Sequence, residues 1–399
     1  MTLPAGLVAF RALAPRTRAA MVARVAPWVL ALTTLAATPA PAQTLLDFSA
    51  TERERILAHG PWPTPGVRDA ANRVDGQRAA IDFGARLFFD PRLSAGGDVS
   101  CASCHQPPLA FQDGRRVAKG RADGIRNTPT LLDVAQQRWF GWDGAHDSLW
   151  AASLSPLLQA GEMGLRLETL AATVRREAPL AAGYRAAFGA APGADDEVVA
   201  VDVAKALAAW QATLVSPRTA FDEFRDALAR GDSAAAARYP QAAQRGLRLF
   251  IGEARCSVCH AGPAFTNGEF ADIGVPFFVP GGVDPGRHGG LQKLLASRLN
   301  RLGPHNDAGA ADPRAVATRH VIVEPRHFGE FRVPGLRQLV HTAPYMHDGR
   351  LPRIEDVVQH YSALDEERLH ADGERILRRL DLTAGQAADL AAFLRSLSR

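Results

Sequence analysis

Two copies of a C-x-x-C-H motif constrain this chain more strongly than any other feature of its sequence. They contain all four cysteines among the 399 residues: Cys101-Ala-Ser-Cys104-His105 and Cys256-Ser-Val-Cys259-His260. The motif attaches haem c, because its two thiols meet the vinyl groups of one porphyrin and the following histidine lies over the iron. A four-cysteine zinc site gives no reason for the histidines, a thioredoxin-like site needs only one such pair, and paired disulfides are the remaining alternative. We therefore predict two covalently bound haem c groups, with His105 and His260 as proximal iron ligands.

The sequence around the two motifs is weakly repeated. Each motif follows Arg-Leu-Phe and precedes a Pro-x-Leu segment, at Pro129 and Pro334, with an Asp-Gly pair fourteen residues after the proline. The later part of the repeat is offset by 205 positions and the cysteine motif by 155, so the second copy has about 50 extra residues, at 275–324. Most segments have the apolar spacing of amphipathic helices, such as 197–214 and the segment that follows the capping box Thr383–Gln386. We predict a mainly α fold of two cytochrome c-like haem domains with long loops, residues 43–217 and 218–399, the second with the ~50-residue insertion.

Residues 1–42 have the pattern of a secretory signal peptide. They hold four arginines and no acidic residue, followed by an apolar run at 25–37 and an A-x-A cleavage site that ends at Ala42. The run of about 13 residues is too short to span a hydrocarbon core of ~30 Å, which disfavours an uncleaved anchor. We predict cleavage after Ala42, export to the periplasm, and no membrane span in the mature protein.

The formal charge of +4 lies entirely in that leader. The remaining 357 residues carry 42 basic and 42 acidic groups, so the mature chain is neutral. The excess of basic residues therefore gives no reason to expect nucleic acid as a partner.

The first haem lacks an evident second axial ligand. Between His105 and Trp142 the sequence has no histidine and no methionine. A six-coordinate haem transfers electrons, whereas a haem with an open position binds peroxide or oxygen. We therefore predict that the haem of His105 is the reaction site, and we interpret His146, the nearest candidate ligand, as a surface or supporting histidine. For the second haem, Met163 and Met346 are the only methionines after the leader.

Further segments accompany both motifs. In the first half they are Leu87–Ser94 (LFFDPRLS), Arg126–Leu132 (RNTPTLL), Trp142–Gly144 and Glu162-Met163. In the second half they are Gly262-Pro263, Phe331–Pro334 (FRVP) and Thr342–Gly349 (TAPYMHDG). Together with the haem motifs, these segments resemble the bacterial di-haem cytochrome c peroxidase family, which includes the MauG-type enzymes. The resemblance covers about residues 80–165 and 245–395.

The resemblance implies roles for particular residues. Glu162 matches the distal carboxylate that moves protons during O–O cleavage, and Trp142 matches the aromatic residue between the two haems. Asn127, with the backbone carbonyls of Thr342 and Pro344, matches the family's calcium site between the haems. Oxygen ligands of this kind suit Ca²⁺.

Two positions distinguish this chain from typical members of the family. The distal ligand of the second haem is usually a methionine, and the ungapped match here is Tyr361, the MauG-like choice, whose oxygen stabilises ferric and higher states. Met346 is an alternative ligand, but it lies where the family has an apolar filler. His360 is another alternative, but helical neighbours point about 100° apart, so only one of the two residues faces the iron. Ala152 stands four residues before Pro156, where the family often has glutamine, so the distal hydrogen-bond network differs or a water replaces the amide.

These expectations combine into one hypothesis and one alternative. Hydrogen peroxide reacts at the open haem of His105 with proton transfer by Glu162, and the oxidising equivalents are shared through Trp142 with the second haem, held by His260 and Tyr361. A small redox protein then supplies electrons, or a partner protein is itself oxidised, as in the MauG-type enzymes. The alternative is a non-catalytic di-haem electron-transfer cytochrome c.

Overall fold

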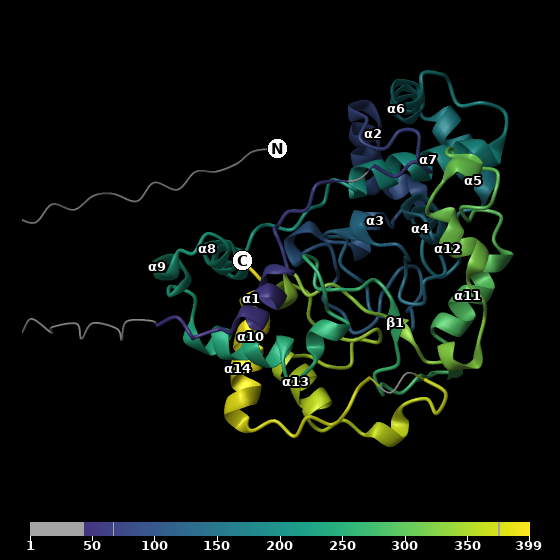
Figure 1. Ribbon diagram of the computed structural model, residues 1–399. Coiled ribbons are helices and arrows are strands. Elements are labelled where there is room, and N and C mark those ends of the chain that lie inside the picture. Colours follow the sequence, from purple (N-terminus) through teal and green to yellow (C-terminus); the bar gives the residue numbers. More distant parts are fainter. Residues whose placement is uncertain (1–43, 67, 374–375) are drawn as a thin grey trace, which may run out of the picture. The chain divides into compact units, whose positions relative to one another are not determined.

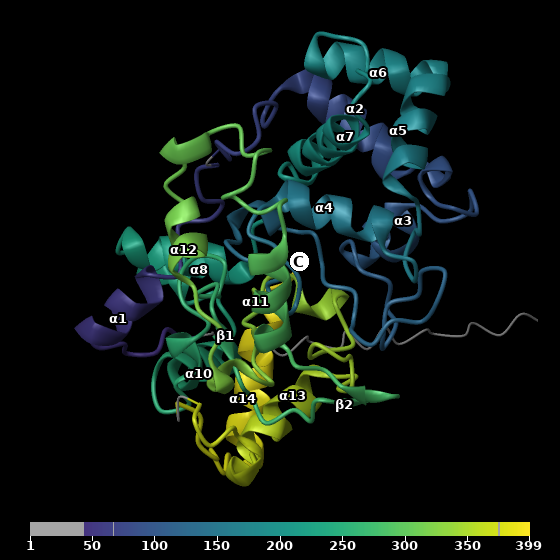
Figure 2. The ribbon, with the colours of Figure 1, turned by 90° about the vertical axis from the view of Figure 1, so that its right-hand side faces the viewer.

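The computed structural model describes residues 44–66, 68–373 and 376–399, and these residues are mainly helical (Figures 1 and 2). The predicted signal peptide lies outside them. The helices are α1 Ala50–Leu57, α2 Arg78–Phe88, α3 Cys101–Cys104, α4 Leu149–Leu158, α5 Leu167–Arg176, α6 Ala178–Phe188, α7 Asp196–Gln211, α8 Ala220–Ala229, α9 Ser233–Ala236, α10 Gln241–Ile251, α11 Arg287–Ala296, α12 Ala315–His320, α13 Ile354–Ser362 and α14 Ala384–Arg395. Two antiparallel pairs join the short strands β1 Phe270–Ala271 with β4 Phe331–Arg332, and β2 Phe278–Val279 with β3 Gly282–Val283. The mainly α part of the prediction is confirmed, and no helix in the described ranges is long and apolar enough to cross a bilayer.

A first hydrophobic cluster is built around α7, which lies against α2, α4 and α5. Asp195 caps the start of α7, because its carboxylate accepts hydrogen bonds from the backbone N–H groups of Glu197 and Val198. Most of the residues that follow are buried, so this helix has no polar face and belongs in an interior. The helix predicted over 197–214 is therefore present and ends at Gln211.

A second hydrophobic cluster contains α8, α10, α13 and α14. It also contains Phe48 and Ile56 from the segment of α1, and α1 lies against α8 and α10. Apolar side chains of 45–57 therefore pack with the second half of the chain, and the division into haem domains at residues 43–217 and 218–399 stays a prediction. The capping box at Thr383 is present at the start of α14, as predicted.

Each cluster contains a close helix crossing at a glycine that precedes a haem motif. A Cβ at Gly84 of α2 would overlap the backbone carbonyl of Ala206 in α7. A Cβ at Gly246 of α10 would overlap the carbonyl of Asp389 in α14, and α10 and α14 lie side by side in Figure 1. Each glycine stands four residues before the phenylalanine of the Arg-Leu-Phe segment that leads into a haem motif. The weak sequence repeat therefore corresponds to a repeated helix pair.

Residues 275–324, the segment predicted as an insertion, contain β2, β3, α11 and α12 and make many polar contacts with the first half of the chain. Arg126 donates two hydrogen bonds to the carboxylate of Asp284, at 2.6 and 2.7 Å. The buried ammonium of Lys205 lies 2.7 Å from a carboxylate oxygen of Asp307. Leu291 of α11 packs in a small cluster with Trp139 of the first half. This segment therefore fastens the second half of the sequence to the first.

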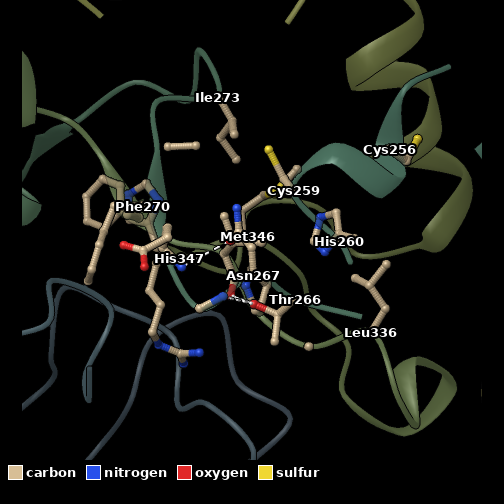
Figure 3. A pocket seen from close by; sticks show the side chains of 18 of the residues that line it. Cys256, Cys259, His260, Thr266, Asn267, Phe270, Ile273, Leu336, Met346 and His347 are labelled. Atoms are coloured by element: carbon tan, nitrogen blue, oxygen red, sulfur yellow. Dashed lines mark hydrogen bonds between the residues drawn. The ribbon is translucent and has the colours of Figure 1, made fainter. Parts of the chain in front are cut away.

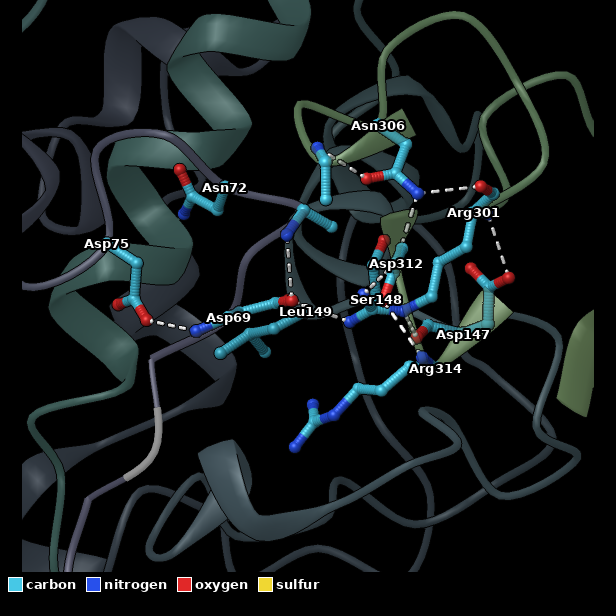
Figure 4. A network of polar contacts seen from close by, with 12 residues as sticks. Asp69, Asn72, Asp75, Asp147, Ser148, Leu149, Arg301, Asn306, Asp312 and Arg314 are labelled. Carbon is cyan, nitrogen blue, oxygen red and sulfur yellow. Dashed lines mark hydrogen bonds and ion pairs between the residues drawn. The ribbon is translucent and has the colours of Figure 1, made fainter. Parts of the chain in front are cut away.

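Arg301 lies at the centre of a network of polar contacts between this segment and the first half of the chain (Figure 4). Its side chain is 1% exposed and its guanidinium forms ion pairs with Asp69 at 2.8 Å and with Asp312 at 2.7 Å. Its Nε donates a hydrogen bond to the backbone carbonyl of Asp147 at 2.8 Å. Asp147 immediately precedes Ser148, the N-cap of α4, so Arg301 fixes the start of that helix.

Candidate active site

The first haem motif forms α3, which ends in His105. Nδ1 of His105 donates a hydrogen bond to the backbone carbonyl of Phe111 at 2.9 Å, because a carbonyl oxygen accepts only. Phe111 has a left-handed backbone with φ of 60°, which turns its carbonyl toward the imidazole. Burial lowers the pKa of His105, so the imidazole is neutral, and its Nε2 is the nitrogen left for a metal.

The second motif repeats this arrangement. Nδ1 of His260 donates to the backbone carbonyl of Phe265 at 3.0 Å, and Phe265 also has a left-handed backbone, with φ of 55°. Burial lowers the pKa of His260 to about 4. The ring of His59 stacks on the ring of Phe265, with 4.6 Å between their centroids, and so supports the loop that carries Phe265. The sequence did not indicate this role of His59. The neutral, oriented histidines and the unbridged cysteines of both motifs fit covalent haem attachment.

A cavity of about 1740 Å³ adjoins the second motif (Figure 3). His260 and Tyr361 both line it, and so does Met346, the alternative ligand. Burial raises the pKa of Tyr361, and its hydroxyl makes no hydrogen bond within the described part of the chain. Nε2 of the neighbouring His360 donates instead to the backbone carbonyl of Ile273 at 2.8 Å. The cavity therefore brings together the proximal histidine and the tyrosine predicted for the second haem, while His360 is engaged elsewhere.

Trp142, from the first half of the chain, lines the same cavity. Its Nε1 donates a hydrogen bond to the backbone carbonyl of Asn127 at 2.8 Å. The backbone N–H of Asn127 in turn donates to the carbonyl of His347 at 2.7 Å. This chain of bonds fixes the indole where segments from both halves of the sequence meet.

The three residues predicted for calcium also line this cavity: Asn127, Thr342 and Pro344. The side-chain amide of Asn127 donates to the backbone carbonyl of Arg115 at 2.7 Å, which leaves Oδ1 as the available acceptor. The described residues contain no cluster of three or more acidic, histidine or cysteine side chains suited to a metal. A site built from amide and carbonyl oxygens is of a different kind, so the calcium site stays a prediction.

Glu162 lies beside the first haem motif, in the turn that follows α4. Burial raises the pKa of both thiols, Cys101 and Cys104, and the negative charge of Glu162 adds to the rise, so its carboxylate is close to them. Glu162 is an exposed residue, and desolvation by the protein atoms around its carboxyl raises its pKa. Gly120 makes the close approach of the neighbouring loop possible, because a Cβ there would lie 2.7 Å from Cα of Glu162. No described residue donates a hydrogen bond to the carboxylate, which is therefore available to an external proton donor.

Comparison with known proteins decides the family. The chain is 34% identical over 353 residues to the methylamine utilization protein MauG of Methylorubrum extorquens, which covers 88% of this chain and 86% of the relative. The chain belongs to the di-haem cytochrome c peroxidase family. The family profile described as di-haem cytochrome c peroxidase matches residues 78–230 of this di-haem peroxidase. Family membership makes the chain an enzyme with two c-type haems.

Two further relatives support the same assignment. The cytochrome-c peroxidase IdrP1 of Denitromonas iodatirespirans is 33% identical over 344 residues, which are 85% of this chain and 86% of the relative. The crystal structure of the diheme peroxidase BthA from Burkholderia thailandensis superimposes with a TM-score of 0.64 at 23% identity, over 84% of this chain and 89% of that one. At that identity the structural likeness shows that this di-haem peroxidase shares the fold.

Proposed function

We propose that this di-haem peroxidase reacts with hydrogen peroxide beside His105 and shares the oxidising equivalents with the haem of His260 and Tyr361. The observation that carries the proposal is the position of Glu162 beside the loop that also contacts the first haem motif. In that loop the carbonyl of Lys119 accepts a hydrogen bond from the thiol of Cys104 at 3.4 Å, and the backbone N–H of Arg121 donates to the carbonyl of Glu162 at 3.0 Å. The splitting of a peroxide bond needs a group that moves a proton, and a carboxylate at this position can do so.

In this proposal the residues of the chain have separate tasks. The bound haems supply the redox chemistry with peroxide. Glu162 accepts a proton from one peroxide oxygen and returns it to the leaving oxygen. Trp142, held by the carbonyl of Asn127, lines the cavity beside the second haem motif and relays electrons between the haems. Tyr361 faces the cavity of His260 as the oxygen ligand of the second haem.

Several finer points belong to the same proposal. The two haems lie in two cytochrome c-like regions, the second carrying the insertion at 275–324. A calcium ion between them is held by Asn127 and the carbonyls of Thr342 and Pro344. The mature protein begins after Ala42 and works in the periplasm. Its reducing partner is a small redox protein, or its substrate is a partner protein, as the likeness to MauG-type enzymes suggests.

The test is a titration of the diferric holoprotein with hydrogen peroxide, followed by addition of a reduced cytochrome c. We expect a spectral change complete at a stoichiometric amount of peroxide, and one high-spin and one low-spin ferric haem before the addition. If the reduced cytochrome is oxidised at a useful rate, a small redox protein is the electron donor. If it is not oxidised, the substrate is a partner protein. Two low-spin haems and no response to peroxide would instead support the electron-transfer cytochrome.

The ligand assignment at the second haem gives a separate prediction. We expect Tyr361→Phe to abolish the low-spin ferric EPR signal of the second haem, because phenylalanine offers no oxygen to the iron. Tyr345→Phe is the matched control: its hydroxyl also belongs to this cavity but donates to the backbone carbonyl of Leu339 at 2.8 Å. If the signal survives in Tyr361→Phe, another residue, with Met346 the first candidate, is the ligand.

A further inference from the structure

Buried arginines in the described part of the chain fall into two groups. Those less than one-tenth exposed are Arg287, Arg301, Arg332 and Arg337. Arg301 is paired with Asp69 and Asp312, and Arg337 forms a two-bond pair with Asp222 at 2.8 and 2.9 Å. Neither Arg287 nor Arg332 has a carboxylate of the described residues within ion-pairing distance. Both of these unpaired cations line the cavity next to His260.

Arg332 is the more isolated of the two. It lies on β4 and is 5% exposed. Its Nε donates a hydrogen bond to the backbone carbonyl of Gly141 at 3.2 Å, and its guanidinium carbon lies 5.9 Å from the centre of the Trp142 ring. Desolvation is the only influence on its pKa, which it lowers to about 10, so no nearby carboxylate compensates the charge.

Arg287 comes from the insertion, at the start of α11, and is 4% exposed. One of its terminal nitrogens donates to the backbone carbonyl of Gly144 at 2.9 Å. Its guanidinium lies over the rings of Phe270, at 3.9 Å, and Trp139, at 4.5 Å. The negative charges of Glu269, Asp143 and Glu330 act on it from a greater distance and offset part of the lowering of its pKa by burial. In each arginine the remaining N–H groups are left for a partner in the cavity.

A buried cation without a counter-ion is unfavourable, because the protein interior replaces water poorly. Both guanidiniums nevertheless stay charged near neutral pH, since burial lowers the pKa of each only to about 10. Carbonyl oxygens and aromatic rings compensate a guanidinium in part, whereas a carboxylate does so with paired, charge-assisted hydrogen bonds. Arg332 therefore has no compensating carboxylate among the described residues, and Arg287 has only the more distant charges of Glu269, Asp143 and Glu330. Each arginine can accept a carboxylate of a ligand in the cavity.

We propose that Arg332 and Arg287 bind carboxylates in this cavity, and that these are the propionate groups of the second haem. A haem joined to Cys256 and Cys259 would lie in the cavity that both arginines line, and a haem carries two carboxylates at its edge. A small free carboxylate ligand has the same chemistry and is the other possible source. This inference rests on the second haem of the proposed function and not on the reaction with peroxide.

The arrangement also affects Trp142. Arg332 lies beside the indole, and a positive charge there opposes the loss of an electron from the ring. A propionate paired with Arg332 cancels that charge. The two arginines therefore both orient the cofactor and leave Trp142 able to act as a relay.

The test is the midpoint potential of the second haem in the holoprotein, followed at its low-spin absorption bands. We expect Arg332→Gln to favour the ferric form about tenfold, which is a midpoint lower by about 59 mV for one electron, because the propionate loses its counter-charge. Arg332→Lys should keep most of the wild-type potential. Arg287→Gln gives an independent measurement if Arg332→Gln does not fold, and it should shift the potential in the same direction.

Arg138→Gln is the matched control, since Arg138 lines the same cavity but is exposed and lies 3.6 Å from a carboxylate oxygen of Glu269. The midpoint potential of the second haem in Arg138→Gln should equal that of the wild type. Unchanged potentials in both Arg332→Gln and Arg287→Gln would overturn the proposal, as would equal shifts in Arg138→Gln. Loss of the low-spin haem itself would instead count against the two-haem site.

A titration with sodium acetate separates the two sources of the carboxylate. If the propionates already occupy the arginines, acetate should cause no saturable change at the second haem in the wild type. A saturable change that disappears in Arg332→Gln would show that the arginines are open to a free carboxylate, and it would overturn the propionate assignment.

Discussion

Glu162→Gln should slow the reaction of the diferric protein with hydrogen peroxide by about 10²-fold or more, the usual contribution of a positioned proton-transfer group. The amide keeps the size of the side chain but cannot accept a proton from peroxide. Stopped-flow absorbance of the haem bands measures the rate constant directly. Glu168→Gln is the control, since Glu168 is an exposed glutamate of the neighbouring helix α5 that pairs with Arg166. Equal rates in Glu162→Gln and the wild type would remove Glu162 from the mechanism.

The same carboxyl predicts a pH dependence. Desolvation raises the pKa of Glu162 above its ordinary value of 4.5. Below this raised pKa the group is protonated and cannot accept another proton, so the rate constant should fall as the pH is lowered through it. The fall should begin at a higher pH than for a carboxyl with an ordinary pKa. The rate constant of Glu162→Gln should not fall with pH in this way. A wild-type rate constant that stays the same as the pH is lowered through the raised pKa would contradict the role of Glu162 as the proton acceptor.

Arg301→Met is expected to lower the free energy of unfolding by about 3–5 kcal/mol, the usual effect of removing one partner of a buried ion pair. The methionine keeps much of the side-chain volume but leaves the carboxylates of Asp69 and Asp312 without a counter-charge. Denaturant unfolding of the holoprotein, followed by far-ultraviolet circular dichroism, gives the difference.

Arg298→Met provides the comparison for this measurement. Arg298 belongs to the same insertion and lies 3.2 Å from Glu197, but its side chain is 68% exposed. Exposed pairs contribute about 0–1 kcal/mol, so this variant should be close to the wild type. If the two variants are destabilised equally, the buried network around Arg301 does not hold the insertion in place.

Local features of this fold could be predicted from the sequence. The capping box at Thr383 and the apolar spacing of α7 depend on neighbouring residues only, and both elements lie close to their predicted positions. The packing of α1 with the second cluster was missed, because it depends on contacts with residues about two hundred positions away, such as the bond from the backbone N–H of Leu46 to Gln244. Spacing along the chain carries no information about such a partner.

The candidate site shows the same division. The motif itself indicates His105 and His260, and the resemblance leads to Glu162 and Tyr361. The role of Arg332 was missed, since an arginine becomes unusual only when its burial and the absence of a carboxylate beside it are known. His59 was also missed, because its contact with Phe265 joins segments far apart in the sequence.

The path of residues 275–324 has a consequence for how the chain reaches its native state. Synthesis proceeds from the N-terminus, so Asp147 and Lys205 are made well before their partners Arg301 and Asp307. Asp307 follows Lys205 by 102 positions in the sequence, so the ammonium of Lys205 has no ion pair with Asp307 until that part of the chain has been made. We therefore expect the first half not to finish folding as an independent fragment. A chain that stops at residue 217 should fold poorly, and one that starts at 218 would leave Arg301 without Asp69, one of its two carboxylate partners.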